Sequence, residues 1–209
     1  MRNFRHFLNK LTYALIAVIA LSGCFEPLGN NILSSMPNQV VYAKKAKKRA
    51  KKSRKETASA EWKWAQPKAS VYIDLDGDKN LTAAANHAIQ VWNDTGAFTF
   101  TKTKNQKKAD ITIESVYSPN TTYAGYTTFH FYVKSGLLFS ADTKLNTYYL
   151  DNFSSYNYSY ERVVNTVEHE LGHAIGLKHN NGQSVMYPTG SIYSIQETDI
   201  EAVKKLYNN

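Results

Sequence analysis

The strongest constraint on this chain of 209 residues is a single stretch, residues 169–179, with the sequence His-Glu-Leu-Gly-His-Ala-Ile-Gly-Leu-Lys-His. His169 and His173 are four residues apart, so on a helix their side chains project from one face, one turn apart, and can bind the same metal ion. Glu170 lies beside the first histidine, where its carboxylate can reach a water molecule on that metal. The spacing therefore predicts a helix that presents two metal ligands and a carboxylate base.

The second half of the stretch supplies a third candidate ligand. Gly176 can adopt the left-handed conformation that ends many helices, so the chain can turn back and bring His179 to the metal. Three imidazoles that leave one coordination position open are typical of catalytic zinc, because a structural site fills its fourth position with protein. Any one of these histidines alone would more often be an ordinary capped or buried side chain, but five fixed positions in register make that alternative weak.

The stretch resembles the signature of the metzincin metallopeptidases, H-E-x-x-H-x-x-G-x-x-H followed by a methionine turn. Residues 184–188, Ser-Val-Met-Tyr-Pro, resemble that turn, with Met186 seven residues after His179. The Met-Tyr-Pro form resembles the matrixin branch. The resemblance implies that Met186 forms a hydrophobic floor beneath the zinc and that Tyr187 and Pro188 border the substrate pocket. Gly190 stands where many relatives have a tyrosine that lines this pocket.

The resemblance covers about residues 62–207 and implies the fold. It implies an α+β, metzincin-like catalytic domain over residues 61–209, with a twisted, mostly parallel five-stranded sheet, three helices and a zinc cleft. Alternation in the sequence predicts strands at residues 69–74, 98–103, 110–116, 123–133 and 145–150. Helical spacing predicts helices at residues 81–95, capped by Asp78 or Asn80, and at 160–177. A last helix is predicted to begin at the capping-box pattern Ser194 to Glu197 and to continue through Leu206.

The resemblance also implies the activity, an exported zinc-dependent endopeptidase that hydrolyses protein or peptide substrates. It implies that His169, His173 and His179 bind one catalytic Zn²⁺, and that Glu170 is the general base toward a zinc-bound water. The substrate is expected to lie extended along an edge strand near residues 123–128, where backbone pairing accepts many sequences.

Some features of the family are missing from the sequence. Vertebrate matrixins carry a second zinc and calcium ions before the fifth strand, whereas residues 117–146 contain only His130 and Asp142 as candidate ligands, so we expect no second zinc. Residues 74–78, Asp-Leu-Asp-Gly-Asp, suggest calcium, but the glycine is misplaced for an EF-hand and a plain turn is the favoured interpretation. We expect no control by a cysteine-switch propeptide, because the only cysteine of this sequence is Cys24, in the predicted export signal.

Residues 1–24 predict an export signal. Arg2, Arg5 and Lys10 precede the apolar residues 11–21, a run that is short for a membrane-spanning helix and suits a signal peptide. Leu21-Ser22-Gly23-Cys24 resembles the lipobox of bacterial lipoproteins, so Cys24 is the predicted lipidation site. An incidental cysteine in an uncleaved anchor is one alternative. Cleavage after Val41-Tyr42-Ala43, as in ordinary secretion, is another. We expect the chain at the cell surface, lipid-anchored, or otherwise secreted.

Residues 25–60 predict a disordered polar tether. Its residues 44–55 contain nine of the 25 Lys and Arg residues, and a block this dense stays solvated. A sharper hypothesis is contact with an anionic envelope polymer or with lipid headgroups. From Glu56 onward acidic residues outnumber basic ones, 16 to 13, so we expect no nucleic-acid partner. Two other classes remain as alternatives: a zinc-binding surface protein without activity, which the intact Glu170 disfavours, and a polyanion-binding module.

Overall fold

The computed structural model describes residues 21–22, 62–151 and 155–208. Cys24, the predicted tether at residues 25–60 and its basic block at 44–55 lie outside the described residues. Within the described part of the chain, no helix is both long and apolar enough to cross a membrane.

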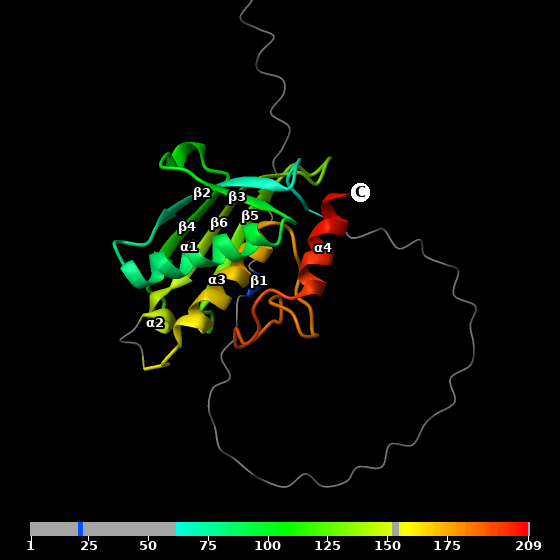
Figure 1. The fold of residues 1–209 in the computed structure, drawn as a ribbon. Helices are drawn as coiled ribbons and strands as arrows, with labels where there is room; N and C mark the ends of the chain where they lie inside the picture. The colour runs from blue at the N-terminus through cyan, green and yellow to red at the C-terminus, as the bar shows by residue number, and fades with distance from the viewer. Residues whose placement is uncertain (1–20, 23–61, 152–154, 209) are drawn as a thin grey trace, which may run out of the picture.

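A twisted sheet forms one layer of the molecule (Figure 1). Its strands lie in the order β1-β5-β6-β4-β2-β3, and the β2/β3, β2/β4 and β4/β6 pairs are parallel, whereas β5 runs antiparallel to β6 and to β1. The bounds are β1 Leu21–Ser22, β2 Lys68–Asp74, β3 Thr99–Lys102, β4 Ile111–Val116, β5 Gly125–Phe131 and β6 Leu138–Asn146. The predicted α+β class with a mostly parallel five-stranded sheet is confirmed, and the two-residue β1 adds a sixth strand beside β5.

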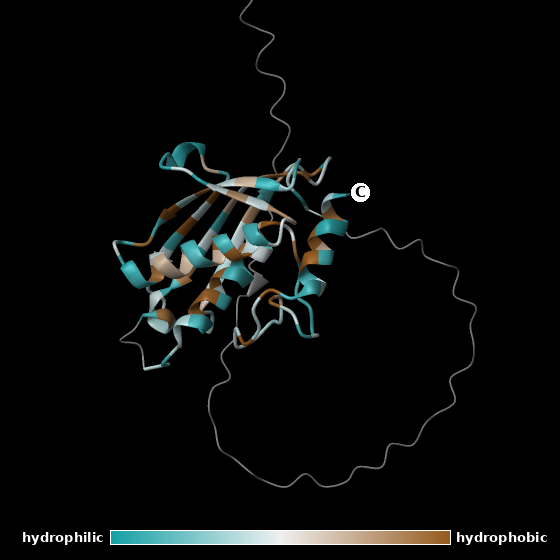
Figure 2. Cartoon of the chain, viewed as in Figure 1, coloured by the Kyte–Doolittle hydropathy of each residue, from teal (hydrophilic) through white to brown (hydrophobic). Residues whose placement is uncertain are grey.

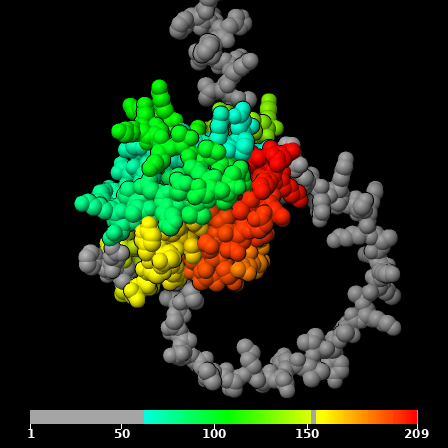
Figure 3. Space-filling view, viewed as in Figure 1, coloured from blue at the N-terminus to red at the C-terminus, as the bar shows by residue number. Residues whose placement is uncertain are grey.

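Helices α1 (Lys79–Asp94) and α3 (Tyr160–Ala174) cover one face of this sheet (Figure 1). Asp78 caps α1 by accepting hydrogen bonds from the amides of Asn80 and Leu81. The one-turn α2 (Thr147–Leu150) follows β6, a 3₁₀ turn spans Gln106–Lys108, and α4 (Glu197–Tyr207) ends the domain. In Figure 3 the segment between α3 and α4 (orange) fills the surface between the start of α3 (yellow) and α4 (red).

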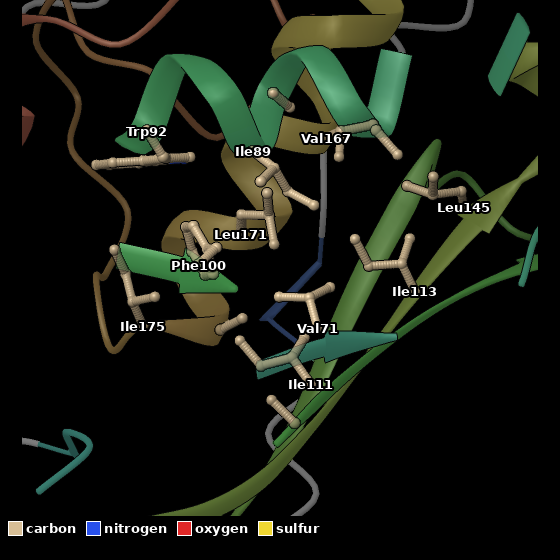
Figure 4. Packing of buried hydrophobic residues seen from close by; sticks show 14 of the residues in the cluster. Val71, Ile89, Trp92, Phe100, Ile111, Ile113, Leu145, Val167, Leu171 and Ile175 are labelled. Carbon is tan, nitrogen blue, oxygen red and sulfur yellow. The ribbon is translucent and has the colours of Figure 1, made fainter. Parts of the chain in front are cut away.

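The core lies between the sheet and the two long helices, where apolar side chains from both layers interdigitate (Figure 4). The hydropathy colouring shows the same division on α1, where brown and teal positions alternate along the helix and its apolar residues are the buried ones (Figure 2). Two buried indoles bind α3 through its main chain: Trp92 of α1 donates to the Glu168 carbonyl at 3.0 Å, and Trp64 donates to the Ala174 carbonyl at 3.0 Å. Helix α3 is therefore fixed along its axis as well as packed.

Three predicted boundaries are wrong. The strand predicted at residues 145–150 ends at Asn146, and the tyrosine-rich residues after it form α2, because the Asn146 side chain caps a helical turn by accepting from the Tyr148 amide. The first part of β6 was not predicted, because apolar Phe139 is exposed and polar Thr143 is buried, which breaks the expected alternation. The last helix begins at Glu197, and its capping box pairs Gln196 with Asp199 instead of Ser194 with Glu197.

Asn146 holds the loop that leads into β5. Its side chain is buried and donates to the carbonyls of Ser118 and Tyr123, both at 2.9 Å, and to the Thr121 hydroxyl at 3.3 Å. Its amide oxygen accepts from the main-chain amides of Ser118 at 3.0 Å and Tyr148 at 3.2 Å. One amide side chain thus ties the two ends of this loop to the start of α2.

Replacing Asn146 with Ala should lower the free energy of unfolding by about 2–4 kcal/mol, because several buried polar groups would lose their partner at once. Urea unfolding of the purified protein measures this loss. Asn120→Ala, an exposed asparagine of the same loop, is the matched control and should change stability by less than about 0.5 kcal/mol. Equal losses in the two variants would show that Asn146 does not hold the loop.

Candidate active site

Helix α3 and the turn after it bring the three predicted histidines together. Ser159 caps the start of α3 by accepting from the Arg162 amide, and the helix ends at Ala174. Gly176 then has φ +100°, and a Cβ atom there would overlap the Trp62 carbonyl oxygen, so both the conformation and the close packing require glycine. The chain turns sharply at this point and carries His179 back toward the helix.

The three imidazoles face one another. Their ring centroids are 4.7 Å apart for His169 and His173, 5.2 Å for His169 and His179, and 4.8 Å for His173 and His179. One nitrogen from each ring lies within 4.8 Å of the other two. The Nε2 atoms of His173 and His179 are 3.2 Å apart, an approach that needs a proton or a cation between two nitrogen lone pairs.

Backbone carbonyls fix the orientation of the first two rings. His169 Nδ1 lies 2.7 Å from the Val185 carbonyl oxygen, and His173 Nδ1 lies 3.0 Å from that of Leu177. A carbonyl can only accept, so each Nδ1 carries a proton and each Nε2 presents a lone pair to the cluster. Burial lowers the pKa of His169 to about 4 and that of His173 well below its usual value, which keeps both rings in the neutral form that binds metals.

Glu170 lies beside this cluster and is fully buried. Its Oε2 atom accepts a hydrogen bond from the Thr127 hydroxyl at 2.8 Å, and its Oε1 atom has no hydrogen-bond partner among the described residues. Burial raises the pKa of Glu170 to about 8. Strand β5 approaches closely here, because a Cβ atom at Gly125 would lie 2.9 Å from Glu170 Cγ. Sequence reasoning missed both β5 residues, although an isolated glycine in a strand often marks such an approach.

The predicted methionine turn lies directly against α3. Met186 is buried, and a Cβ atom at Gly172 would overlap its sulfur, so the glycine between the two helical histidines makes room for the turn. Asp199, in the first turn of α4, accepts from the Ser184 hydroxyl and from the Val185 amide at 2.9 Å. The start of α4 therefore positions the same Val185 whose carbonyl orients His169, a role that the sequence reasoning did not assign to Asp199.

The residues after the turn form a loop attached to the first half of α3. Tyr187 and Pro188, predicted to border the substrate pocket, are half-buried, and the Tyr187 ring packs edge-on against Tyr193 with centroids 5.8 Å apart. Arg162 Nε donates to the Gly190 carbonyl at 2.8 Å, and the Thr166 hydroxyl lies 2.7 Å from that of Ser191. The helix that carries the histidines therefore also fixes this loop.

The sequence of this chain is similar to known proteins over the region that forms the site. The family model of the matrixins matches residues 63–208. The chain is also similar to the macrophage metalloelastase of Rattus norvegicus, with 31% identity over 134 residues that cover 57% of this chain and 27% of that protein. The chain thus spans only about a quarter of the length of this relative.

A buried acid on α3 gives a pH-dependent prediction. Glu168 is 1% exposed, its Oε2 accepts from the Ile195 amide at 3.2 Å, and burial raises its pKa to about 7 from 4.5. The folded state therefore keeps a proton that the unfolded state releases above pH 4.5, so stability falls as the pH rises from about 4.5 to 7. Glu168→Gln mimics the protonated form and should gain up to about 3 kcal/mol over the parent at pH 8, and little at pH 4.5.

Urea unfolding of both proteins at pH 4.5 and pH 8, at matched zinc concentrations, measures this difference. Glu161→Gln replaces an exposed acid on the same helix. In this control, the change in unfolding free energy between pH 4.5 and pH 8 should equal that of the parent. A Glu168→Gln advantage that is equal at both pH values would contradict the linkage.

Proposed function

The chain belongs to the matrixin family of zinc metalloendopeptidases, and from that premise we propose that His169, His173 and His179 hold the catalytic zinc and that Glu170 is the general base. One observation carries this proposal. Three buried polar side-chain atoms of the described residues lack hydrogen-bond partners: two of them, His169 Nε2 and Glu170 Oε1, belong to this cluster, and the third is Trp62 Nε1. Such orphaned groups are costly unless a ligand or a reaction uses them.

The donor set fits zinc. Three neutral imidazoles with their lone pairs converging, two of them held by backbone carbonyls through the opposite nitrogen, are typical of a catalytic site that keeps one position open. When bound, zinc would supply a Lewis acid that polarises the scissile carbonyl and lowers the pKa of water toward 7.

The protein's own residues would move the proton. Glu170 Oε1 would take a proton from the attacking water, whose oxygen forms a bond to the carbonyl carbon of the substrate. Glu170 would then deliver that proton to the amine nitrogen as the peptide bond breaks. The burial that raises the pKa of Glu170 to about 8 suits a group that must hold a proton between these two steps.

We place the substrate along the edge of β5 that faces away from β6, where the two-residue β1 pairs in this structure. Gly125 and Thr127 of this strand lie against Glu170, so a peptide paired with β5 would pass the base. The pairing of β1 with Tyr126 and Thr127 supports this, because it indicates that the edge accepts an antiparallel partner. Backbone pairing of this kind tolerates many side chains, so proteins and peptides are the proposed substrates.

The first test is cleavage of casein by the purified chain with zinc. Glu170→Gln should lower turnover by about 10²- to 10⁴-fold and still bind one zinc per chain, because it removes the base and leaves the ligands. His173→Ala should lose zinc and turnover together, and a chelator should abolish cleavage reversibly. His87→Ala, an exposed histidine of α1 that stacks on Tyr160, is the control and should change neither property. A zinc-loaded parent that leaves casein and a peptide library intact would favour the zinc-binding protein without activity.

Export remains part of the proposal and rests on the sequence of residues 1–24. Cleavage before Cys24 would remove residues 1–23, and β1 with them, and would leave this edge of β5 open. Mass spectrometry of the chain expressed in a bacterium should find a lipid-modified Cys24 as the first residue, and Cys24→Ser should release the protein from the membrane fraction. A mature chain that begins at Lys44 would instead support ordinary secretion. The basic block at residues 44–55 would then add a salt-sensitive contact with anionic polymer or lipid headgroups.

A further inference from the structure

We infer that Thr127 is a positioning residue that determines which oxygen of Glu170 takes the proton in catalysis, with Thr143 orienting Thr127. The inference rests on the proposed function, because it assigns a role within the same proton transfer. It is carried by hydrogen bonds of this chain that do not involve the metal ligands.

The Thr127 hydroxyl lies between three oxygen atoms. It is 2.8 Å from Glu170 Oε2, 3.0 Å from the Glu170 carbonyl oxygen and 3.0 Å from the Thr143 hydroxyl. Thr127 and Thr143 are directly opposite each other on β5 and β6, and both are fully buried. The other inward positions around them are small or apolar: Gly125, Phe129, Ala141 and Leu145.

Counting protons shows how these groups are connected. A threonine hydroxyl donates one hydrogen bond, and a bond to a carboxylate is stronger than one to a neutral carbonyl. Thr127 therefore donates to Glu170 Oε2 when the acid is ionised, and Thr143 donates in turn to Thr127. The Oε2 atom is thus engaged, and Oε1 is the carboxylate oxygen left free to accept the proton of the attacking water.

The same bond can persist after the transfer. When Oε1 carries the proton, Oε2 is the carbonyl oxygen of a carboxylic acid and still accepts from Thr127. A carboxylate otherwise rotates broadly about its last torsion, so a bond that survives both protonation states keeps the free oxygen in one place. The proton would then be taken up and released at the same position.

A purely structural role explains this pair less well. Burying two hydroxyls in an apolar layer is unfavourable unless they are hydrogen-bonded, and valine would fill each position with nearly the same shape. Within the described residues, the Thr143 hydroxyl is hydrogen-bonded to the Thr127 hydroxyl. We therefore attribute the two buried hydroxyls to the hydrogen bond that Thr127 donates to Glu170.

The test is Thr127→Val beside Thr127→Ser in the zinc-loaded full chain. Loss of a hydrogen bond to a charged group should lower kcat by about 10- to 100-fold with KM nearly unchanged. The serine variant keeps the hydroxyl and should recover most of that loss, and Thr143→Val should fall between the two. Thr112→Val, on β4, removes a hydroxyl that bonds Asp142 instead of Glu170 and is the control. Thr127→Ala repeats the test if the valine variant does not fold.

Two measurements do not depend on activity. Zinc content and the thermal unfolding midpoint should stay close to those of the parent in Thr127→Ser, and zinc content should stay at one per chain in Thr127→Val. A crystal structure of Thr127→Val should show the Glu170 carboxylate rotated or in several orientations. Parental kcat together with an unmoved carboxylate would overturn the inference, as would a serine variant as slow as the valine variant. A parent that binds zinc but cleaves nothing would instead overturn the proposed function, and the crystal structure would still test the position of Glu170.

Discussion

The structure depends on one helix that carries a polar site through an apolar core. From Val163 to Ala174 nearly every residue of α3 is buried, and Glu168, His169, Glu170 and His173 are among them. Each buried polar atom needs a partner, because an unpaired one costs about 1–3 kcal/mol. The surrounding elements supply those partners from distant parts of the chain: the Val185 and Leu177 carbonyls, the Ile195 amide and the Thr127 hydroxyl.

This requirement explains why the loops around α3 are fixed rather than loosely attached. Asp199 holds Val185 in place, Gly172 admits Met186 against the helix, and Gly176 allows the turn that returns His179. Two of the three buried side-chain atoms left without partners in the described chain, His169 Nε2 and Glu170 Oε1, are those that a metal and a proton transfer would use. Binding of zinc would therefore complete the hydrogen-bonding and coordination of the core, so metal affinity and folding stability should be coupled.

Most of what was predictable from the sequence was local. The spacing of His169 and His173 and the apolar stripe of α1 each lie within one element, where periodicity is informative. Apart from the helical turn that Asn146 caps, the misses depend on contacts between distant segments. Strand β6 was not recognised because Thr143 faces inward, and it faces inward because it meets Thr127 on the neighbouring strand. The acceptors for the histidine rings are backbone carbonyls, which every residue type has, so no sequence pattern marks them.

The capping box of α4 also shows that a local pattern cannot fix a helix start when a tertiary contact decides it. Ser194 and Glu197 match the pattern, but Asp199 is the acid that reaches back to the Gln196 amide, and it does so while it also binds Ser184 and Val185 of the methionine turn. A helix can begin at several nearby positions at similar cost, so a tertiary contact at one of them decides the start. Here the deciding contact is that of Asp199 with Ser184 and Val185, which fixes the methionine turn beside the histidines. The start of the last helix is therefore set by the methionine turn, whose Ser184 and Val185 lie fifteen and fourteen residues before Asp199.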